Sequence, residues 1–251
     1  MYDNTLLNAV IEVIEGCSNT KKNLCISATG AHGLVTAYND VKFKEVLDHF
    51  FINLPDGMPG VWVGRLKGAK NMSRCYGPEF FEDILSKSTK YKINHFFCGG
   101  KVGVAEELKT KCEENFQNFN IVGTYTPPFK GMDNKEIQSL GDKIDSLQTD
   151  IVWIGLSTPK QEIFAARLAK YVHVHFIITV GAAFDFHTGN VRQAPGILQK
   201  YSLEWLFRLL MEPGRLYKRY LKIVPLFIFY NILEFIYFLI KKIIGRKYAK
   251  Y

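Results

Sequence analysis

Short polar stretches follow the apolar runs of this 251-residue chain, and they contain the side chains suited to handling a charged ligand. One of them, GLSTPKQE at 155–162, places Lys160 and Gln161 at the expected start of a helix. Thr158, Pro159 and Gln161 fit the N-cap, N1 and N3 positions of a capping box. The same arrangement would aim backbone N–H groups, the Lys160 ammonium and the positive helix end at one point, which suits a diphosphate.

A glycine-rich turn, CGGKVG at 98–103, also joins an expected strand to an expected helix. Glycines let a backbone approach a ligand closely, and a helix N-terminus attracts phosphate. The stretch matches neither GxGxxG nor GxxxxGK[ST], so it lacks both the dinucleotide and the P-loop fingerprint. A nucleotide site and a tight turn with a solvated Lys101 both remain open.

Asp56 stands in the stretch LPDGMPG (54–60), directly after another expected strand. Pro-Asp-Gly is an ordinary turn triplet, in which the aspartate has a purely local role. A carboxylate at the end of a strand can also act as a general base. The triplet alone leaves both interpretations open.

The cysteines and histidines show no pattern of a metal or disulfide site. The five cysteines are odd in number and lack CxxC spacing, which fits a reducing cytoplasm. His173 and His175 alternate along one expected strand, as exposed or capping residues often do, without an HxxxH or paired-carboxylate set beside them. No GxSxG motif accompanies them. We therefore expect no metal.

The elements that must position these stretches alternate along the first 200 residues. Six apolar, strand-like runs are separated by segments with helical periodicity, a pattern typical of a parallel sheet covered on both faces. The expected strands are 23–29, 50–54, 93–99, 120–125, 150–155 and 175–181, and the expected helices are 33–49, 59–67, 78–88, 103–117, 134–147 and 159–171. The pattern predicts a Rossmann-like α/β domain, in which ligands bind beyond the carboxyl ends of the strands. The N-terminus has no signal-peptide pattern, so we do not expect secretion.

The net charge of +8 lies entirely in the last 44 residues. Residues 208–251 contain ten of the 32 Lys and Arg and two of the 24 Asp and Glu, which leaves 22 of each sign elsewhere. This asymmetry predicts a catalytic domain over 1–195 and a basic, aromatic helical appendage over 196–251. Pro213 and Pro225 are expected to break the appendage into separate helices.

The apolar run 223–240 of the appendage indicates contact with a membrane. Its eighteen residues would form a helix of about 27 Å, which is marginal for crossing a bilayer. Basic residues flank both ends, and Asn231 and Glu234 begin a narrow polar stripe that continues through Lys241 and Gly245. Both features favour a helix that lies in the membrane interface, where each basic residue near anionic lipid contributes about 1 kcal/mol.

Other partners for the appendage have less support from its sequence. A helix that caps the domain or joins copies of the chain is the alternative to membrane contact, and an exposed apolar helix would favour a homo-oligomer in solution. Nucleic acid is not expected, because a long apolar run is a poor surface for following phosphates.

Longer segments of the chain resemble the WecG/TagA/CpsF family of bacterial glycosyltransferases, glycosyltransferase family 26. The segments that carry the resemblance are PDG, YGPEFFEDIL, FFCGGKVGVAEELKTKC, NIVGTYTPPF, DIVWIGLSTPKQEIFAARL and VGAAFDFHTGNVRQAPGILQKYSLEWLFRLLMEPGRLYKRYL. They cover most of residues 50–221 in the order and spacing of the family.

The resemblance implies an inverting transfer of a sugar from a UDP-sugar to a sugar linked to undecaprenyl diphosphate. The transferred sugar would be N-acetylmannosamine, as in wall teichoic acid synthesis, or a related hexose or uronic acid for another cell-surface polysaccharide. The enzyme would work as a peripheral protein at the cytoplasmic face of the bacterial inner membrane. No divalent metal or other cofactor is implied, which agrees with the absence of a DxD motif.

The resemblance also implies roles for single residues. Asp56 corresponds to the proposed catalytic base, Thr29 to a polar residue on the acceptor side, and Gln161 to a glutamine near the donor sugar. Three cationic residues of the appendage correspond to positions that close over the diphosphate: Arg208, Arg215 and Lys218. The nucleotide-side loops that would bind the UDP-sugar donor contain Gly100, Lys101, Tyr125, Lys160 and Asp185.

Two other functions remain as alternatives at this point. A nicotinamide-dependent oxidoreductase would use the same kind of sheet, but it would lack its GxGxxG motif and leave the appendage unexplained. A non-catalytic membrane scaffold would need the appendage but no carboxylate at position 56.

Overall fold

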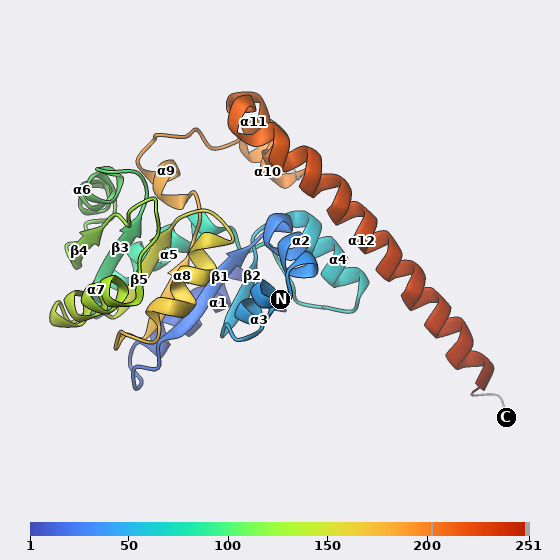
Figure 1. Ribbon diagram of the computed structural model, residues 1–251, viewed down its shortest axis with the longest axis horizontal. Helices are drawn as coiled ribbons and strands as arrows, with labels where there is room; N and C mark the ends of the chain where they lie inside the picture. Colours follow the sequence, from blue (N-terminus) through green and yellow to red (C-terminus); the bar gives the residue numbers. More distant parts are fainter. Residues whose placement is uncertain (202, 249–251) are drawn as a thin grey trace. The chain divides into compact units, whose positions relative to one another are not determined.

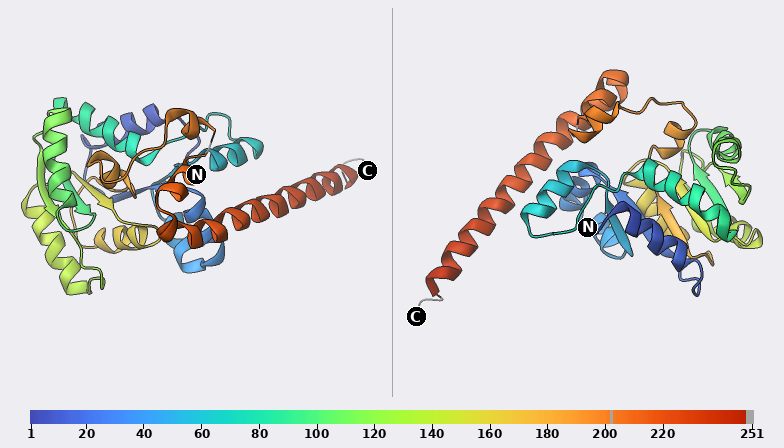
Figure 2. Two further views of the ribbon diagram at one scale, coloured as in Figure 1. Left: turned by 90° about the horizontal axis from the view of Figure 1, so that it is seen from above. Right: turned by 180° about the vertical axis from the view of Figure 1, so that it is seen from behind.

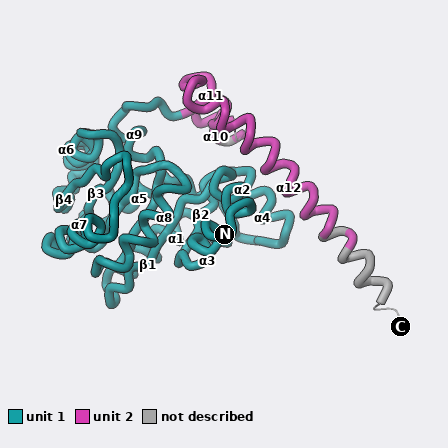
Figure 3. The backbone as a smooth tube through the Cα atoms, in the orientation of Figure 1, with its two compact units in different colours: residues 1–193 teal, residues 194–251 magenta. Residues whose placement is uncertain are grey.

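The computed structural model describes residues 1–201 and 203–248, with the side chains of 200, 238–239 and 241–248 outside the description. The chain divides into two compact units, Met1–Gln193 and Ala194–Tyr251 (Figure 3). The division falls two residues before the boundary predicted from the composition.

The first unit is built on one sheet of six parallel strands (Figure 1). The strands are β1 (Leu24–Thr29), β2 (Ile52–Pro55), β3 (His95–Gly99), β4 (Ile121–Tyr125), β5 (Ile151–Gly155) and β6 (Phe176–Thr179). Their order across the sheet is β2-β1-β6-β5-β3-β4. All six strands expected from the sequence are present within a few residues, which confirms the α/β fold.

Helices cover both faces of the sheet (Figure 2). The helices α1 (Leu6–Gly16), α5 (Gly77–Ser88), α6 (Val104–Phe116) and α9 (Ala183–His187) contribute to one apolar cluster, and α7 (Asn134–Ser146) and α8 (Lys160–Leu168) contribute to the other. Consecutive residues of β1, β3, β5 and β6 face opposite clusters; Ile26 belongs to the first and Cys25 to the second. This double coverage explains why the strands are almost continuously apolar.

One buried histidine sits within the first cluster's layer. The indole N–H of Trp153 donates to Nδ1 of His95 at 3.1 Å, and Nε2 of His95 lies 2.9 Å from the Ser88 hydroxyl. Because an indole nitrogen can only donate, Nδ1 is the acceptor and Nε2 carries the proton. Complete burial lowers the pKa of His95 to about 3, so it is a neutral structural residue.

Two helical segments near the N-terminus differ from the sequence-based expectation. The expected helix at 33–49 is two helices, α2 (Ala31–Asn39) and α3 (Val41–Asp48). Asp40 divides them because its backbone is extended and its side chain accepts from Phe43 N at 3.1 Å as the N-cap of α3. Helix α1 was not predicted, although Thr5 caps it in the same way. The remaining elements of this unit are α4 (Met58–Leu66) and the short 3₁₀ helix η1 (Thr89–Tyr91).

The second unit consists of α10 (Gly196–Lys200), α11 (Glu204–Met211) and the long helix α12 (Pro213–Tyr248). Helices α11 and α12 pack against each other, with the rings of Trp205 and Tyr220 at 5.9 Å in an edge-on arrangement. Pro213 begins α12 as predicted, but the predicted break at Pro225 is wrong. Proline keeps a helical φ and removes one backbone hydrogen bond, so a long helix can continue through it.

Helix α12 carries the apolar run of the appendage on its surface. The stretch Pro213–Tyr237 is long and apolar enough to cross a membrane by length and composition, and few of its residues are buried. The structure does not describe the side chains of five of the basic residues counted in the sequence: Lys241, Lys242, Arg246, Lys247 and Lys250. One of them, Lys241, belongs to the predicted polar stripe, so that part of the prediction lies outside the described residues.

Candidate active site

The predicted site residues of the first unit lie at one edge of the sheet. All six strands are parallel, so the loops that follow them open on the same side. From β2 to β3 the loops bring, in this order, Asp56, Thr29, the Gly181 turn, the start of α8 and the Gly100 turn. Strands β2 and β3 are four positions apart, or about 19 Å at the usual spacing. The edge is therefore long enough for an extended ligand.

Asp56 occupies one end of this row, directly after β2. Its Oδ1 accepts a hydrogen bond of 2.7 Å from the backbone N–H of Gly77, the first residue of α5. Its own backbone N–H donates to the carbonyl of Thr29 at 3.3 Å. The positive end of a helix stabilises a negative charge. The N-terminus of α5 therefore binds the Asp56 carboxylate and holds it at this edge of the sheet. Asp56 thus has specific tertiary contacts beyond those of an isolated Pro-Asp-Gly turn.

An arginine that the sequence analysis did not assign to the site is also part of this corner. The Nε of Arg74 donates to the backbone carbonyl of Asp56 at 3.1 Å, and its guanidinium lies 4.1 Å from the centre of the Tyr76 ring. The contact places a permanent positive charge beside the Asp56 backbone. No local pattern in the sequence indicates this contact, because the two residues are 18 positions apart.

Thr29, the last residue of β1, lies next to Asp56 because the two strands pair Thr29 with Pro55. Its side chain is buried, and its hydroxyl lies 3.0 Å from Ser27 Oγ and 3.5 Å from Asn53 Oδ1. The strand register therefore makes Thr29 and Asp56 neighbours, and the Thr29 hydroxyl belongs to a network below the edge. Its acceptor-side role stays a prediction.

The capping box predicted for the start of α8 is wrong. The helix begins at Lys160 with Pro159 as its N-cap, so Gln161 is at the second helical position and no side chain caps the helix. The Gln161 Nε2 donates instead to Glu162 Oε1 at 2.9 Å and, at 3.4 Å, to Thr158 Oγ1. A proline at the N-cap has no side-chain acceptor to offer, which leaves these side chains for other contacts.

Gln161 joins the loops after β5 and β6. Its Oε1 accepts from the backbone N–H of Gly181 at 3.0 Å, and the residue is 1% exposed. A contact with the donor sugar would have to use the second lone pair of Oε1, or a rotation of the side chain that breaks the Gly181 bond. The role of Gln161 near the donor sugar stays a prediction, and it requires one of these two arrangements of the side chain.

The glycine turn after β3 is shaped for close backbone contact. Gly100 has a positive φ of 74°, and its N–H donates to the Gly155 carbonyl at 2.9 Å. A Cβ at this position would lie 2.7 Å from Cβ of Val104, the first residue of α6. Only glycine fits, and it brings the turn against the last residue of β5. Lys101 beside it is exposed.

The other predicted donor-side residues surround this part of the edge. Tyr125 ends β4, and burial of its hydroxyl raises its pKa. The ammonium of Lys160 lies 4.6 Å from the centre of the Phe129 ring, in the loop after β4. Phe129 is 96% exposed, so this cation–π pair stands on the surface. Asp185 lies in α9, half-buried, after β6.

The three cationic residues of the appendage belong to the second unit. Arg208 lies in α11, and Arg215 and Lys218 lie in the first turns of α12. Arg215 forms an ion pair with Glu212, with 2.6 Å between Nε and Oε2, and the Lys218 ammonium lies 5.9 Å from the Tyr217 ring. Their closure over a diphosphate stays a prediction.

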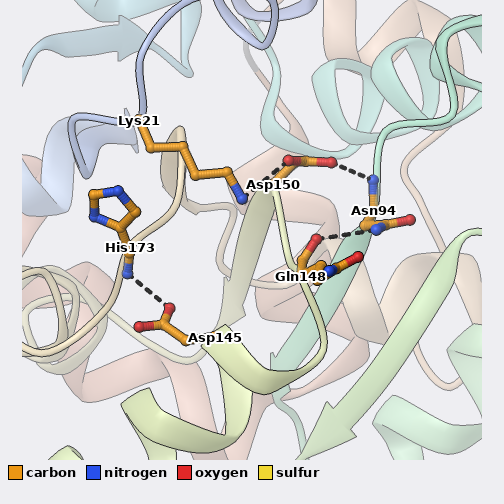
Figure 4. Close-up of a pocket in the computed structure, with 6 residues that line it drawn as sticks. All are labelled: Lys21, Asn94, Asp145, Gln148, Asp150 and His173. Carbon is orange, nitrogen blue, oxygen red and sulfur yellow. Dashed lines mark hydrogen bonds and ion pairs between the residues drawn. The ribbon is translucent and has the colours of Figure 1, made fainter.

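Acidic, cysteine and histidine side chains do not form a metal-ligating group of three or more within the described residues. A pocket of about 540 Å³ lies at the amino ends of the strands, at the edge opposite the candidate site (Figure 4). Asp150 accepts from Asn94 N at 2.9 Å and pairs with Lys21 at 3.3 Å, and His173 N donates to Asp145 at 2.7 Å. These contacts tie the starts of the strands together, which is a structural role.

His173 and His175 lie at this same end of the sheet, but not on a strand as the sequence suggested. Both precede β6, which begins at Phe176. His173 is exposed, whereas His175 is buried with its Nε2 3.6 Å from Asp150. Burial lowers the pKa of His175, although the charge of Asp150 acts in the opposite direction.

Comparison with known proteins identifies a family and a curated relative. Residues 1–238 match the model of the glycosyl transferase WecG/TagA/CpsF family. The N-acetylglucosaminyldiphosphoundecaprenol N-acetyl-beta-D-mannosaminyltransferase of Bacillus spizizenii is 32% identical over 182 residues, which are 71% of this chain and 68% of the relative. The family match spans both compact units, from the Asp56 corner into helix α12. The chain belongs to the WecG/TagA/CpsF family of glycosyl transferases, and it is an enzyme that transfers a hexose.

Proposed function

We propose that this enzyme transfers N-acetylmannosamine, or a related hexose or uronic acid, from a UDP-sugar to a sugar linked to undecaprenyl diphosphate. The observation that carries the proposal is the Asp56 carboxylate, held by Gly77 at the start of α5 and next to Thr29. The name of the Bacillus spizizenii relative supports the lipid-linked acceptor, because that enzyme acts on N-acetylglucosaminyldiphosphoundecaprenol.

In this proposal Asp56 is the general base of an inverting transfer. Its carboxylate takes the proton of the acceptor hydroxyl while the hydroxyl oxygen attacks the anomeric carbon of the donor. The bond between that carbon and the UDP oxygen breaks, and its electron pair leaves with UDP. A single carboxylate is enough for this step, because a direct displacement needs no enzyme nucleophile and UDP leaves as an anion that does not have to be protonated.

Negative charge develops on the departing diphosphate and must be stabilised by positive charge. In the proposed mechanism the enzyme supplies this charge from its own residues, without a metal. Lys101 and Lys160 stand at the starts of α6 and α8, whose N-terminal ends also favour anions. Arg208, Arg215 and Lys218 of the appendage would add further charge. With the uridine at the Gly100 and Tyr125 end of the row and the sugar at the Asp56 end, the diphosphate falls between them.

A lipid-linked acceptor requires the enzyme at the membrane, and α12 supports a peripheral attachment to the cytoplasmic face. Exposed apolar residues run along the helix, among them Ile228, Phe229 and Ile236. Lys218 and Lys222 are exposed near its start, where they would meet anionic headgroups. In the absence of membrane the same exposed surface would favour a homo-oligomer.

The proposal is tested by incubating the full chain with a panel of UDP-sugars and a soluble lipid-diphosphate-N-acetylglucosamine analogue, with and without a chelator. We expect one UDP-sugar to be transferred with inversion at its anomeric carbon, at the same rate in both conditions. Loss of transfer on chelation would contradict the metal-independent mechanism. Failure of every UDP-sugar, with a membrane-competent chain and the correct acceptor, would contradict the proposed donor.

A further inference from the structure

A buried glutamate, Glu162, lies next to Gln161 in the first turn of α8 and has no part in the chemistry proposed above. It is 1% exposed. Its Oε1 is the shared acceptor of three hydrogen bonds, from Gln161 Nε2 at 2.9 Å, from Thr158 Oγ1 at 2.9 Å and from Ser27 Oγ at 3.3 Å. A buried carboxyl group needs such partners, because its desolvation is costly.

The three donors come from both halves of the candidate site. Thr158 and Gln161 belong to the loop and helix after β5, on the donor side. Ser27 is a β1 residue whose Oγ also lies 3.0 Å from the hydroxyl of Thr29, on the acceptor side. Glu162 Oε1 is therefore the atom at which the two side-chain networks meet.

The hydrogen bond from Gln161 Nε2 to Glu162 Oε1 also fixes the orientation of the Gln161 carboxamide. Gln161 Oε1 must point toward the Gly181 N–H, and Nε2 toward Glu162. Without an acceptor at Glu162, the remaining partner of Gln161 Nε2 would be Thr158 Oγ1, at the longer distance of 3.4 Å. The amide would then be free to turn over or rotate, and the Gly181 turn would lose its support.

The position of Glu162 argues against a direct role in proton transfer. Its side chain is enclosed beneath α8, where it contacts β1, whereas the proposed base Asp56 stands at the open end of β2. Burial raises the pKa of Glu162, and the hydrogen bonds from Gln161, Thr158 and Ser27 oppose that rise. A glutamine at this position would keep a carbonyl oxygen for the three donors at nearly the same shape.

We infer that Glu162 is a positioning residue for sugar transfer, which holds the Gln161 carboxamide and, through Ser27, the Thr29 hydroxyl in one fixed arrangement. The inference rests on the proposed function, because it assigns Glu162 a part in that reaction through Gln161. It predicts that the acceptor oxygen at position 162, rather than a titrating carboxyl group, is what the reaction needs.

The experiment compares full-length Glu162→Gln, Glu162→Met, Gln161→Ala and the Gln161→Ala/Glu162→Met double variant for kcat, donor KM and thermal unfolding midpoint. Glu162→Gln should keep kcat within about threefold of wild type, because the acceptor oxygen remains. Glu162→Met should lower kcat by about 100-fold with donor KM nearly unchanged, the size expected when a reacting geometry is displaced by about 1 Å. The double variant should be no slower than Gln161→Ala, since the two residues act as one unit.

The control is Glu107→Met, which changes an exposed first-turn glutamate of α6 in the same way and should leave kcat unchanged. A folded Glu162→Met with wild-type kcat would overturn the inference. So would a double variant whose loss of kcat equals the product of the losses of the two single variants. If Glu162→Met does not fold, Thr158→Val removes one partner at the half-exposed rim of the network, and an unchanged kcat there would overturn the inference. An inactive wild-type chain would contradict the proposed function itself, which separates the two failures.

Discussion

The Asp56 carboxylate lies 2.7 Å from the backbone nitrogen of Gly77, so a residue after β2 is anchored to the first residue of α5. Gly77 also lets the helix approach the sheet closely. A Cβ there would lie 3.2 Å from Ala28 Cβ and 3.2 Å from the Val180 carbonyl, and 3.5 Å from Asp56 Oδ1. The orientation of the proposed base thus depends on a backbone N–H that only a close approach of α5 can supply.

Gly77→Ala should therefore lower activity by displacing α5 from Asp56. The two 3.2 Å contacts require shifts of a few tenths of an ångström, and we expect kcat to fall about tenfold, since small displacements of reacting groups are costly. Gly57→Ala is the matched control, because a Cβ there would meet only Pro59 at the ordinary distance of 3.6 Å. Equal kcat values for both variants, measured by steady-state transfer, would show that the Gly77 contact does not position Asp56.

The buried His95 predicts a loss of stability in acid. Its pKa falls from 6.5 in the unfolded chain to about 3 in the folded protein, so the unfolded chain binds more protons between these values. The stabilising contribution is complete above pH 6.5, and it decreases by about 1.4 kcal/mol per pH unit as the pH falls toward 3. The lowered pKa of His175 adds to the slope in the same direction.

His95→Gln tests this linkage, because a glutamine can accept from Trp153 and donate to Ser88 without taking up a proton. Urea unfolding between pH 5 and pH 7.5 should show a free energy of unfolding that depends less on pH in this variant than in wild type. The exposed His49 supplies the control variant His49→Gln, which should keep the wild-type slope. A His95→Gln slope equal to that of wild type would refute a neutral, buried His95.

The basic start of α12 predicts binding to anionic membranes that weakens with salt. In a vesicle sedimentation assay with phosphatidylglycerol, Lys218→Glu/Lys222→Glu should weaken binding more than tenfold, since each basic residue contributes about 1 kcal/mol near such a surface. Lys109→Glu/Lys111→Glu on α6 makes the same charge change in the first unit and should bind like wild type. Equal loss in both double variants would indicate a general charge effect and contradict attachment through α12.

The sequence predicted the parallel sheet and the edge at which the candidate site lies, because both follow from local patterns. Apolar strands separated by amphipathic helices require a covered parallel sheet, and the carboxyl ends of parallel strands gather at one edge. Thr29 and Asp56 were therefore expected on the same side. Their pairing as neighbours depends on the strand register, which a single sequence does not display.

The features that the sequence did not predict depend on contacts between distant residues. Glu162 was interpreted only as the end of a PKQE stretch, because nothing local reveals that Ser27, 135 positions away, donates to it. The capping box was wrong because the local rule fitted Thr158 and Gln161 but both side chains have other partners. Thr158 donates to Glu162, four residues along the chain, and Gln161 accepts from the distant Gly181. Pro225 was interpreted by its intrinsic preference, which the length of α12 overrides.

The most direct test of the account is the rate of a single turnover by Asp56→Asn, with donor and acceptor analogue both saturating. The asparagine keeps an oxygen for the Gly77 N–H but cannot take the acceptor proton, so we expect a rate at least about 1,000-fold below wild type with the thermal midpoint nearly unchanged. Asp142→Asn, at an exposed position on α7, should transfer at the wild-type rate. A folded Asp56→Asn that transfers sugar at the wild-type rate would contradict the assignment of Asp56 as the base.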